Sequence, residues 1–201
     1  MRHICKIIHI LSAYYIFYIQ YDKLYLHITK EEDYMEFRKS LQSDVENILG
    51  IIKEAKEYFK ANNIDQWQED NYPTSETFLD DINNGTSYVL VKDDEVVATA
   101  SISFEPEPTY NHIEGNWLTT DNYIVIHRVA VTNKLKGLGL ASIIFKNAEN
   151  LALDNNVHSI KIDTHSDNKA MQKVLLKNNF TYCGIIHLED NSSRIAFEKT
   201  F

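Results

Sequence analysis

The segment 127–145, HRVAVTNKLKGLGLASIIF, combines a strand end, a short loop and two glycines at the start of a helix. An apolar stretch typical of a strand ends at Val131, and an apolar repeat with helical spacing follows Gly137 and Gly139. Free main-chain N–H groups and the helix dipole at such a junction attract anions, and glycine lets a phosphate approach the backbone. The segment predicts a diphosphate-binding loop, although two glycines at this spacing also occur in tight turns that bind nothing.

Two better-known phosphate-binding loops do not fit this chain. The pattern G-x-x-x-x-G-K-[ST] does not occur in the sequence. A dinucleotide-binding fingerprint needs a third glycine and an early strand–helix–strand unit, and this segment offers neither. We therefore expect a ligand whose diphosphate is held by neither of these two types of loop.

Two histidines near this loop are candidates for acid–base chemistry. His127 alternates with Val125, Val129 and Val131 along an expected strand, which places these four residues on one face. His165 comes directly after the next expected strand. Because imidazole titrates near neutral pH, either residue could accept a proton from a reacting group. Structural roles stay open for both: His127 as a core histidine bonded to a main-chain carbonyl, and His165 as a helix cap or loop residue.

The periodicity of apolar residues predicts the elements that position these groups. A capping box, Ser43 and Glu46, is expected to begin the first helix. The expected helices cover about 44–61, 140–153 and 168–178, with a further short helix after 73–75 that ends at 83–85. The expected strands are a short one from Met35, then 88–91, 96–104, 123–131, 159–164, 182–188 and 194–198. The stretch 105–122 has no clean period and is expected to be a long surface connection. This order predicts an α/β sandwich with a mixed sheet and one parallel crossover.

Composition and charge narrow the class of protein. The 201 residues are 44% apolar and 24% charged, which suits one ordered globular domain. The net charge of −9 argues against nucleic acid as a partner, because phosphate backbones require a surplus of Lys and Arg. Neutral or cationic partners are more compatible with this net charge than nucleic acid is. Cys5 and Cys183 offer at most one disulfide and no metal-ligand spacing, which favours a reducing compartment such as the cytoplasm.

The first 34 residues differ from the rest of the chain. They hold six of the 12 tyrosines, and their four basic residues balance four acidic ones. The uncharged run Ile7–Tyr21 has 15 residues, short of the ~20 that a membrane-spanning helix needs. Arg2 and Lys6 precede an apolar stretch as in a secretory signal, but no small-x-small cleavage site follows. We therefore expect an extension over 1–34, with Met35 as a candidate true start, and a domain over 35–201.

From Met35 to the C-terminus, the sequence resembles the GNAT N-acetyltransferase superfamily. The diphosphate loop of that family has the pattern [RQ]-x-x-G-x-[GA] after a strand. Residues 136–141, KGLGLA, match this pattern with Lys136 in place of Arg or Gln. A later N-x-x-[AM] motif is supplied by 168–171, NKAM, and Asn179-Phe180 stands where Gly-Phe is usual.

The resemblance implies that the domain binds acetyl-CoA and needs no metal. The diphosphate would meet the main-chain N–H groups of the glycine loop and the Lys136 ammonium. The pantetheine arm would pair with the main chain of 129–131, and Asn168 would contact the arm or the leaving sulfur. The implied cofactor-binding residues are Val129, Ala130, Val131, Lys136, Gly137, Leu138, Gly139, Leu140, Ala141, Ser142 and Asn168.

The resemblance also implies direct attack of an amine on the thioester in a ternary complex. His127 is the first candidate for the base and His165 the second, while Arg128 is expected to be a structural ion-pair partner. The residues expected near the acceptor are Tyr110, His112, Glu114 and Trp117. Many family members carry a tyrosine seven residues after the motif asparagine, but this chain has Leu175 there. Tyr182 and Cys183 are possible replacements.

Several functions stay open at this point. A small-molecule amine is the favoured acceptor, and the negative charge favours a cationic one such as a polyamine. A protein N-terminus or lysine is an alternative acceptor. A binding module that holds acyl-CoA without catalysis is a further alternative, supported by Leu175 and by the unproven base. Members of the family often form homodimers, but nothing in the sequence fixes the oligomeric state.

Overall fold

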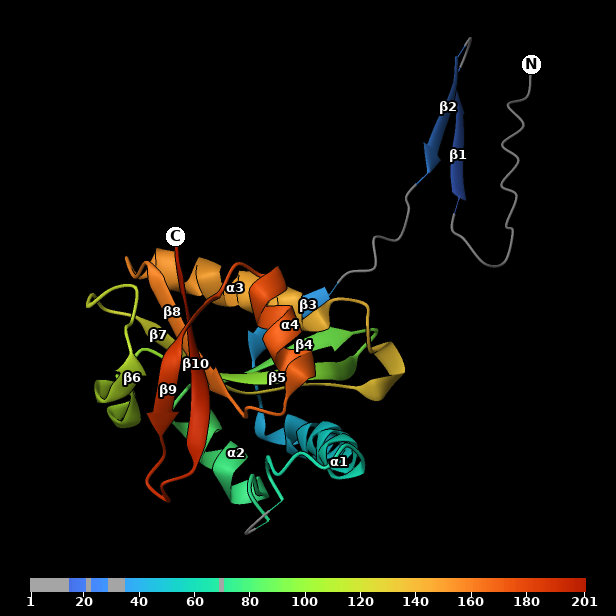
Figure 1. Cartoon of the computed structure of the whole chain (residues 1–201). Helices are drawn as coiled ribbons and strands as arrows, with labels where there is room; N and C mark the ends of the chain where they lie inside the picture. The colour runs from blue at the N-terminus through green and yellow to red at the C-terminus, as the bar shows by residue number, and fades with distance from the viewer. Residues whose placement is uncertain (1–14, 21–22, 29–34, 69–70) are drawn as a thin grey trace, which may run out of the picture. The chain divides into compact units, whose positions relative to one another are not determined.

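Figure 1 shows the computed structural model, which describes residues 15–20, 23–28, 35–68 and 71–201. The chain divides into two compact units, Met1–Met35 and Glu36–Phe201. In the first unit, β1 (Tyr15–Gln20) and β2 (Lys23–Ile28) form an antiparallel pair. The predictions that concern Arg2, Cys5 and Lys6 lie outside the described residues. No helix in the described part of the chain is long and apolar enough to cross a membrane.

The second unit is built on an eight-stranded mixed sheet with the order β3-β4-β5-β7-β8-β10-β9-β6. Its strands are β3 (Met35–Lys39), β4 (Ser87–Lys92), β5 (Glu95–Ser103), β6 (Ile113–Gly115), β7 (Ile124–Val131), β8 (Ser159–Thr164), β9 (Thr181–His187) and β10 (Ser193–Thr200). Strands β7 and β8 are parallel, and the pairs β4–β5, β5–β7, β8–β10, β9–β10 and β6–β9 are antiparallel. The predicted mixed sheet with one parallel crossover is confirmed.

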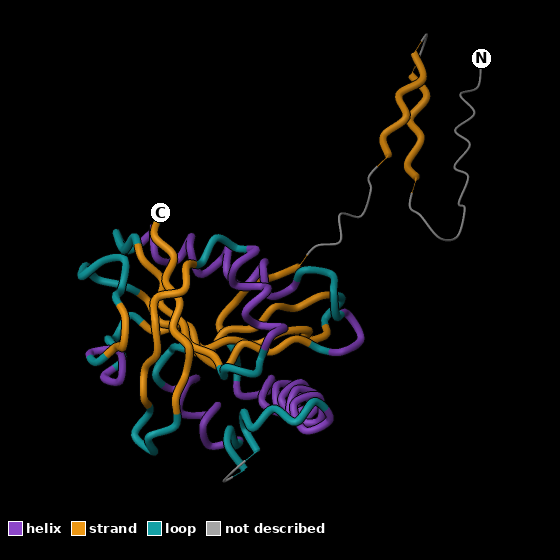
Figure 2. Tube along the Cα trace, in the orientation of Figure 1, coloured by secondary structure: helices purple, strands orange, loops and turns teal. Residues whose placement is uncertain are grey.

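Helices cover both faces of this sheet (Figure 2). They are α1 (Val45–Ala61), α2 (Ser75–Asn83), α3 (Leu140–Asp154) and α4 (Lys169–Lys177). The α1 and α2 side chains Ile48, Ile52 and Phe78 pack with Val89 and Ala130 of the sheet in one buried cluster. In Figure 1, α1 and α2 lie below the sheet, and α3 and α4 lie above it. The expected helices 44–61, 140–153 and 168–178 are confirmed to within one residue at each end, and the short helix expected before 83–85 is α2.

The entry into α1 differs from the prediction. The chain passes through a 3₁₀ turn, Gln42–Asp44, before α1 begins. The Asp44 carboxylate accepts the main-chain N–H of Leu41 at 2.7 Å and forms a bidentate pair with Arg38 of β3. These hydrogen bonds hold the pKa of Asp44 below its usual value. The predicted Ser43–Glu46 capping box is wrong, because Arg38 positions Asp44 to cap this turn.

The stretch 105–122 is more ordered than the expected surface connection. It contains a 3₁₀ turn, Pro108–Asn111, and the strand β6, which pairs with β9 at the edge of the sheet. The backbones of Gly115 and Gly184 touch at this pairing, because a Cβ on Gly115 would lie 2.2 Å from the Cys183 carbonyl oxygen. Only glycine fits this approach. The pairing fixes where the long connection returns to the sheet.

Glu198 of β10 holds the end of this connection. Its side chain is fully buried and accepts hydrogen bonds from the Ser159 hydroxyl at 2.6 Å and from the main-chain N–H groups of Leu118 and Thr119. The Lys161 ammonium lies opposite Glu198 on β8, over the rings of Trp117 (4.5 Å) and Tyr123 (3.9 Å). Burial lowers the pKa of Lys161. The hydrogen bonds of Glu198 and the ring contacts of Lys161 together hold the 105–122 connection against the sheet.

We expect Glu198→Ala to lower the free energy of unfolding by about 3–5 kcal/mol, because it leaves buried donors and a buried ammonium without their carboxylate. Urea denaturation followed by circular dichroism measures the change. Glu189→Ala is the control, since Glu189 is exposed and loses no buried contact. A loss equal to that of the control would contradict this role of Glu198.

Candidate active site

The cavity of interest opens where β7 and β8 separate. The two parallel strands pair only at Ile124–Ile160 and Val125–Lys161. Beyond these pairs, a cavity of about 1430 Å³ is lined by 125–131 of β7 and by 162–165 at the end of β8. Unpaired main-chain groups at a separated strand edge can bind an extended ligand as an added strand does. The splayed strands therefore offer a site for a long, flexible molecule.

A β-bulge in β7 shapes one wall of this cavity. Ser101 of β5 pairs with His127, and Thr99 pairs with Ala130, so β7 has one extra residue between these two pairs. Arg128 lies in this interval with a φ of 52°, in the left-handed region. The bulge reverses the alternation of faces along the second half of β7.

The bulge corrects the predicted alternation. Paired residues of antiparallel strands share a face, so His127 and Ala130 lie on the same side of the sheet. Val131 pairs with Ala98 and lies on the other side. The prediction that His127 shares a face with Val131 is wrong, because strict alternation assumes that no residue is inserted.

The glycine loop leads from β7 into α3, as expected. Gly137 and Gly139 have φ values of 88° and 83°, and a Cβ on either would meet no atom within 4 Å. The Ser142 N–H donates to the Gly139 carbonyl at 2.9 Å, and the N–H groups of Leu140 and Ala141 before it have no carbonyl one turn back, so they are available to an anion. The Lys136 ammonium rests 3.6 Å from the ring centre of Tyr58. The loop residues that line the cavity are Lys136, Gly137, Gly139, Leu140, Ala141 and Ser142. Leu138, at 64% exposure, does not line it.

Two further predicted residues line the cavity beside α4. Asn168 is buried, and its Oδ1 accepts the Met171 N–H at 3.1 Å while its Nδ2 donates to Gln66 at 2.9 Å. Asn168 is thus the N-cap of α4 and a link to the loop after α1. His165 Nδ1 accepts the Asp167 N–H at 3.2 Å. Both residues are therefore held by local hydrogen bonds at the cavity wall.

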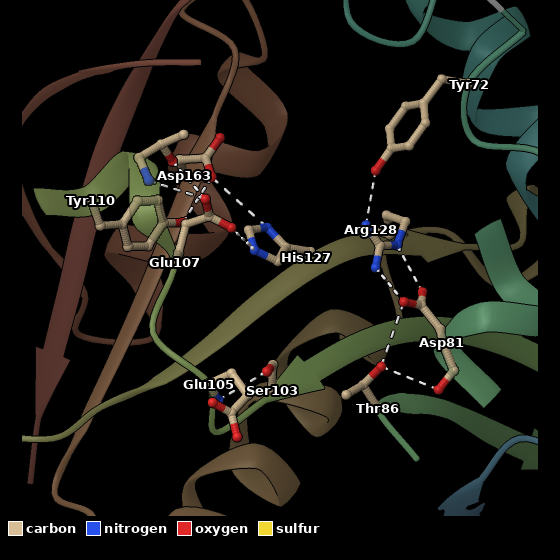
Figure 3. A network of polar contacts seen from close by, with 11 residues as sticks. Tyr72, Asp81, Thr86, Ser103, Glu105, Glu107, Tyr110, His127, Arg128 and Asp163 are labelled. Atoms are coloured by element: carbon tan, nitrogen blue, oxygen red, sulfur yellow. Dashed lines mark hydrogen bonds and ion pairs between the residues drawn. The ribbon is translucent and has the colours of Figure 1, made fainter. Parts of the chain in front are cut away.

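His127 lies between two carboxylates, as Figure 3 shows. Its Nε2 is 3.4 Å from Glu107 Oε2, and its Nδ1 is 3.9 Å from Asp163 Oδ1. The buried Tyr110 hydroxyl donates to Asp163 at 2.7 Å. The neighbouring His127 is the main cause that lowers the pKa of Glu107 to about 2, and hydrogen bonds from Thr109 add to it. This arrangement can accept a proton at His127 and stabilise the resulting positive charge.

The lowered pKa of Glu107 predicts a dependence of stability on acid. A carboxylate with a depressed folded pKa stabilises the fold above its unfolded pKa, and this contribution disappears as pH falls through the folded value. The relevant window runs from 4.5 down to about 2. Because the side chain is 26% exposed and partly screened, we expect a contribution of about 2 kcal/mol.

Urea denaturation of the wild type and Glu107→Gln at several pH values measures this contribution. The wild type should be more stable at neutral pH, and the difference should shrink between pH 4.5 and about 2. A difference that stays constant down to pH 2 would contradict the assignment.

Of the residues expected near the acceptor, Tyr110 lies beside the site: its ring centre is 6.3 Å from that of His127, and its hydroxyl bonds Asp163. Tyr110 is buried under Trp117, whose Nε1 donates to the Tyr110 carbonyl at 2.9 Å. Glu114 pairs with His187 at 2.8 Å on the exposed β6–β9 edge, and His112 is exposed. None of Tyr110, His112, Glu114 and Trp117 lines the cavity itself. The pairing of β6 with β9 carries Glu114 to the edge of the sheet.

Leu175, which stands at the position of the family tyrosine, and its two possible replacements, Tyr182 and Cys183, also lie outside the cavity lining. Leu175 is fully buried, Cys183 is buried with its thiol on the Thr181 carbonyl, and Tyr182 is half exposed. None of the three lines the cavity. Among the described residues, no group of three or more His, Cys, Asp or Glu side chains is arranged to hold a metal ion.

Sequence reasoning missed several residues that line the site, among them Glu107 and Asp81. Glu107 lies in a stretch without periodicity, so no pattern separates it from its neighbours. Asp81 forms a bidentate ion pair with Arg128, at 2.7 and 2.9 Å, across 47 positions of the chain. This pair confirms that Arg128 has an ion-pair partner, although only the structure identifies it.

Known structures share this architecture. A GNAT-family acetyltransferase from Streptococcus agalactiae 2603 is 32% identical with a TM-score of 0.76, over 83% of this chain and 95% of that chain. A GNAT-family acetyltransferase from Listeria monocytogenes 4b F2365 is 16% identical with a TM-score of 0.65, over 83% and 95%. The PaiA N-acetyltransferase from Thermoplasma acidophilum, in complex with coenzyme A, is 14% identical with a TM-score of 0.63, over 84% and 99%. The fold is therefore that of acetyltransferases with a mixed sheet.

Residues 50–180 match the model of the Acetyltransferase (GNAT) family. The chain belongs to the GNAT acetyltransferase family, and its class of activity is acyl-group transfer. No curated protein matches the chain.

Proposed function

We propose that the protein transfers the acetyl group of acetyl-CoA to an amine, with a small-molecule acceptor favoured. The observation that carries this proposal is the continuous cavity that joins the glycine loop at α3 to His127 through the separated strands β7 and β8. The coenzyme A complex of the Thermoplasma acidophilum structure supports the choice of donor, since that protein has the same fold.

The residues of the cavity fit a CoA thioester. Gly137 and Gly139 leave open space beside the N–H groups of Leu140 and Ala141 at the start of α3, and the cationic Lys136 and Lys177 also line the cavity. The main chain of 129–131 would pair with the pantetheine arm. Contact of the arm with Asn168 stays a prediction, since the Asn168 amide already caps α4 and bonds Gln66. Bound there, acetyl-CoA supplies a thioester whose carbonyl carbon an amine can attack directly.

His127 is the proposed general base. An amine must lose a proton to form the amide, and an imidazole at the cavity wall can take that proton. Glu107 and Asp163, on either side of the ring, stabilise the imidazolium that forms. A main-chain N–H near Val129 or Ala130 would stabilise the developing oxyanion. His165 is the second candidate base, since it lines the same cavity.

Charge in the cavity favours a cationic acceptor. Glu107 and Asp163 adjoin His127, and Figure 3 shows Glu105 at the end of β5 on the same side of the site. All three line the cavity, as does Asp190. A second cationic group on the acceptor would lie close to these carboxylates while its amine faces His127. Polyamines and aminoglycoside-like amines have this chemistry.

Release of free thiol from acetyl-CoA by the full chain tests the proposal. The acceptors would be polyamines, aminoglycosides, single amino acids and peptides with free N-termini. We expect release that depends on a cationic small amine and is weak with amino acids. Release with peptides alone would replace the proposed acceptor class with a protein acceptor. Tight calorimetric binding of acetyl-CoA without release by any acceptor would favour a non-catalytic binding module, which the apolar Leu175 supports.

A further inference from the structure

Arg128 has a backbone conformation that is rare for a residue with a Cβ. Its φ of 52° lies in the left-handed region, within a strand. Residues with a Cβ rarely adopt this conformation, and such strain persists only where the surrounding structure enforces it. Arg128 is also next to His127, the proposed base. Some interaction must therefore keep residue 128 at this positive φ and so maintain the bulge.

The guanidinium of Arg128 is fixed on the side of the site opposite His127, as Figure 3 shows. Its Nε and Nη2 donate to the two oxygens of Asp81 at 2.9 and 2.7 Å, and its Nη1 donates to the Tyr72 hydroxyl at 2.8 Å. The side chains of Arg128 and Asp81 are only 16% and 13% exposed. A bidentate pair of this kind fixes direction as well as distance.

Asp81 is itself anchored to the sheet. It lies near the end of α2, and its main-chain carbonyl accepts the N–H of Thr86 at 2.8 Å and the Thr86 hydroxyl at 3.2 Å. Thr86 directly precedes β4. The ion pair thus connects the bulge of β7 to the turn between α2 and β4.

We propose that Arg128 is a positioning residue, whose ion pair with Asp81 holds the β7 bulge and thereby sets the direction of His127 and the cavity wall at 129–131. This inference rests on the proposed function for its kinetic consequences. The guanidinium acts through the backbone, and it does not bind the acceptor. Loss of the pair lets residue 128 leave the left-handed region, so that β7 loses its register with β5.

Three variants separate this role from a merely structural one. Arg128→Ala removes the ion pair and leaves a residue that disfavours positive φ, whereas Arg128→Gly removes the pair but permits it. Asp81→Asn keeps the arginine and removes the charge of its partner. Lys199→Met is the control, because it breaks a similarly buried pair, Lys199–Glu149 at 2.7 Å, away from the cavity lining.

We expect Arg128→Ala and Asp81→Asn to lower kcat by about tenfold or more and to raise the KM for acetyl-CoA. Arg128→Gly should recover most of the loss, although it lacks the ion pair just as Arg128→Ala does. The control should keep wild-type kinetics. Equal impairment of Arg128→Ala and Arg128→Gly, with a raised KM only for the acceptor, would show instead that Arg128 contacts the acceptor. Wild-type kinetics in all variants would also overturn the proposal.

A crystal structure of each Arg128 variant keeps this test independent of the proposed function. The inference predicts a positive φ at position 128 in the glycine variant and a shifted β5–β7 register in the alanine variant. An unchanged bulge in both variants would overturn it, even if the wild type transfers no acetyl group. Failure of the wild type to bind acetyl-CoA would refute the proposed function but leave this structural result standing.

Discussion

Gly139→Glu should raise the Kd for acetyl-CoA by at least about a hundredfold, because it puts a carboxylate where the diphosphate is expected. The φ of 83° at Gly139 also disfavours any residue with a Cβ. No atom lies within 4 Å of a Cβ built there, so the new side chain would extend into open space at the N-terminus of α3. Isothermal titration calorimetry with the full chain measures the effect.

Two control variants separate charge at the loop from backbone strain and from net charge. Gly139→Asn introduces a side chain that tolerates the left-handed region without adding charge, so its affinity should fall much less. Gly50→Glu adds the same charge to α1, at an exposed position where a Cβ also meets nothing within 4 Å. It should bind acetyl-CoA like the wild type. Retained affinity in Gly139→Glu would remove the glycine loop from the proposed cofactor site.

His127→Ala should lower kcat by about a hundredfold to a thousandfold, with little change in the affinity for acetyl-CoA. The wild-type kcat should fall at acidic pH as the base becomes protonated, and the variant should lack this acidic limb. Loss of the base removes proton transfer but leaves the glycine loop intact. Initial rates of thiol release from pH 5 to 9 with a responsive amine measure both effects.

Two other histidines test whether this effect is specific. His187→Ala removes an exposed imidazole on the β6–β9 edge and should leave the pH profile unchanged. His165→Ala should reduce kcat only modestly if His127 is the base. An acidic limb that persists in His127→Ala but disappears in His165→Ala would transfer the role of general base to His165.

The parts of the fold that follow from short-range patterns were predictable. The start of α3 is marked by Gly139 and by an apolar repeat, and the parallel crossover follows from its place between two apolar strands. The resemblance of 136–141 to the family loop drew attention to residues that do line the cavity, apart from Leu138. These features depend on residues that are neighbours in the sequence.

The features that could not be predicted depend on distant partners. The bulge at Arg128 has no glycine or proline to mark it, and the Asp81 carboxylate beside it comes from α2. Likewise, Asp44 displaces the expected Ser43 cap because Arg38 of β3 reaches it. Glu107 becomes part of the site only when the 105–122 connection folds back beside His127. Pairings of this kind are decided by tertiary structure, which local periodicity does not encode.

The most direct test of acetyl transfer is a product balance for the full chain with acetyl-CoA and the amine that gives the fastest thiol release. We expect one N-acetylated amine for each free thiol, and initial-rate lines that intersect when both substrates are varied, since the attack takes place in a ternary complex. Thiol release without the N-acetylated amine would mean thioester hydrolysis and would contradict the account. Parallel lines, typical of a covalent acetyl-enzyme, would contradict direct attack.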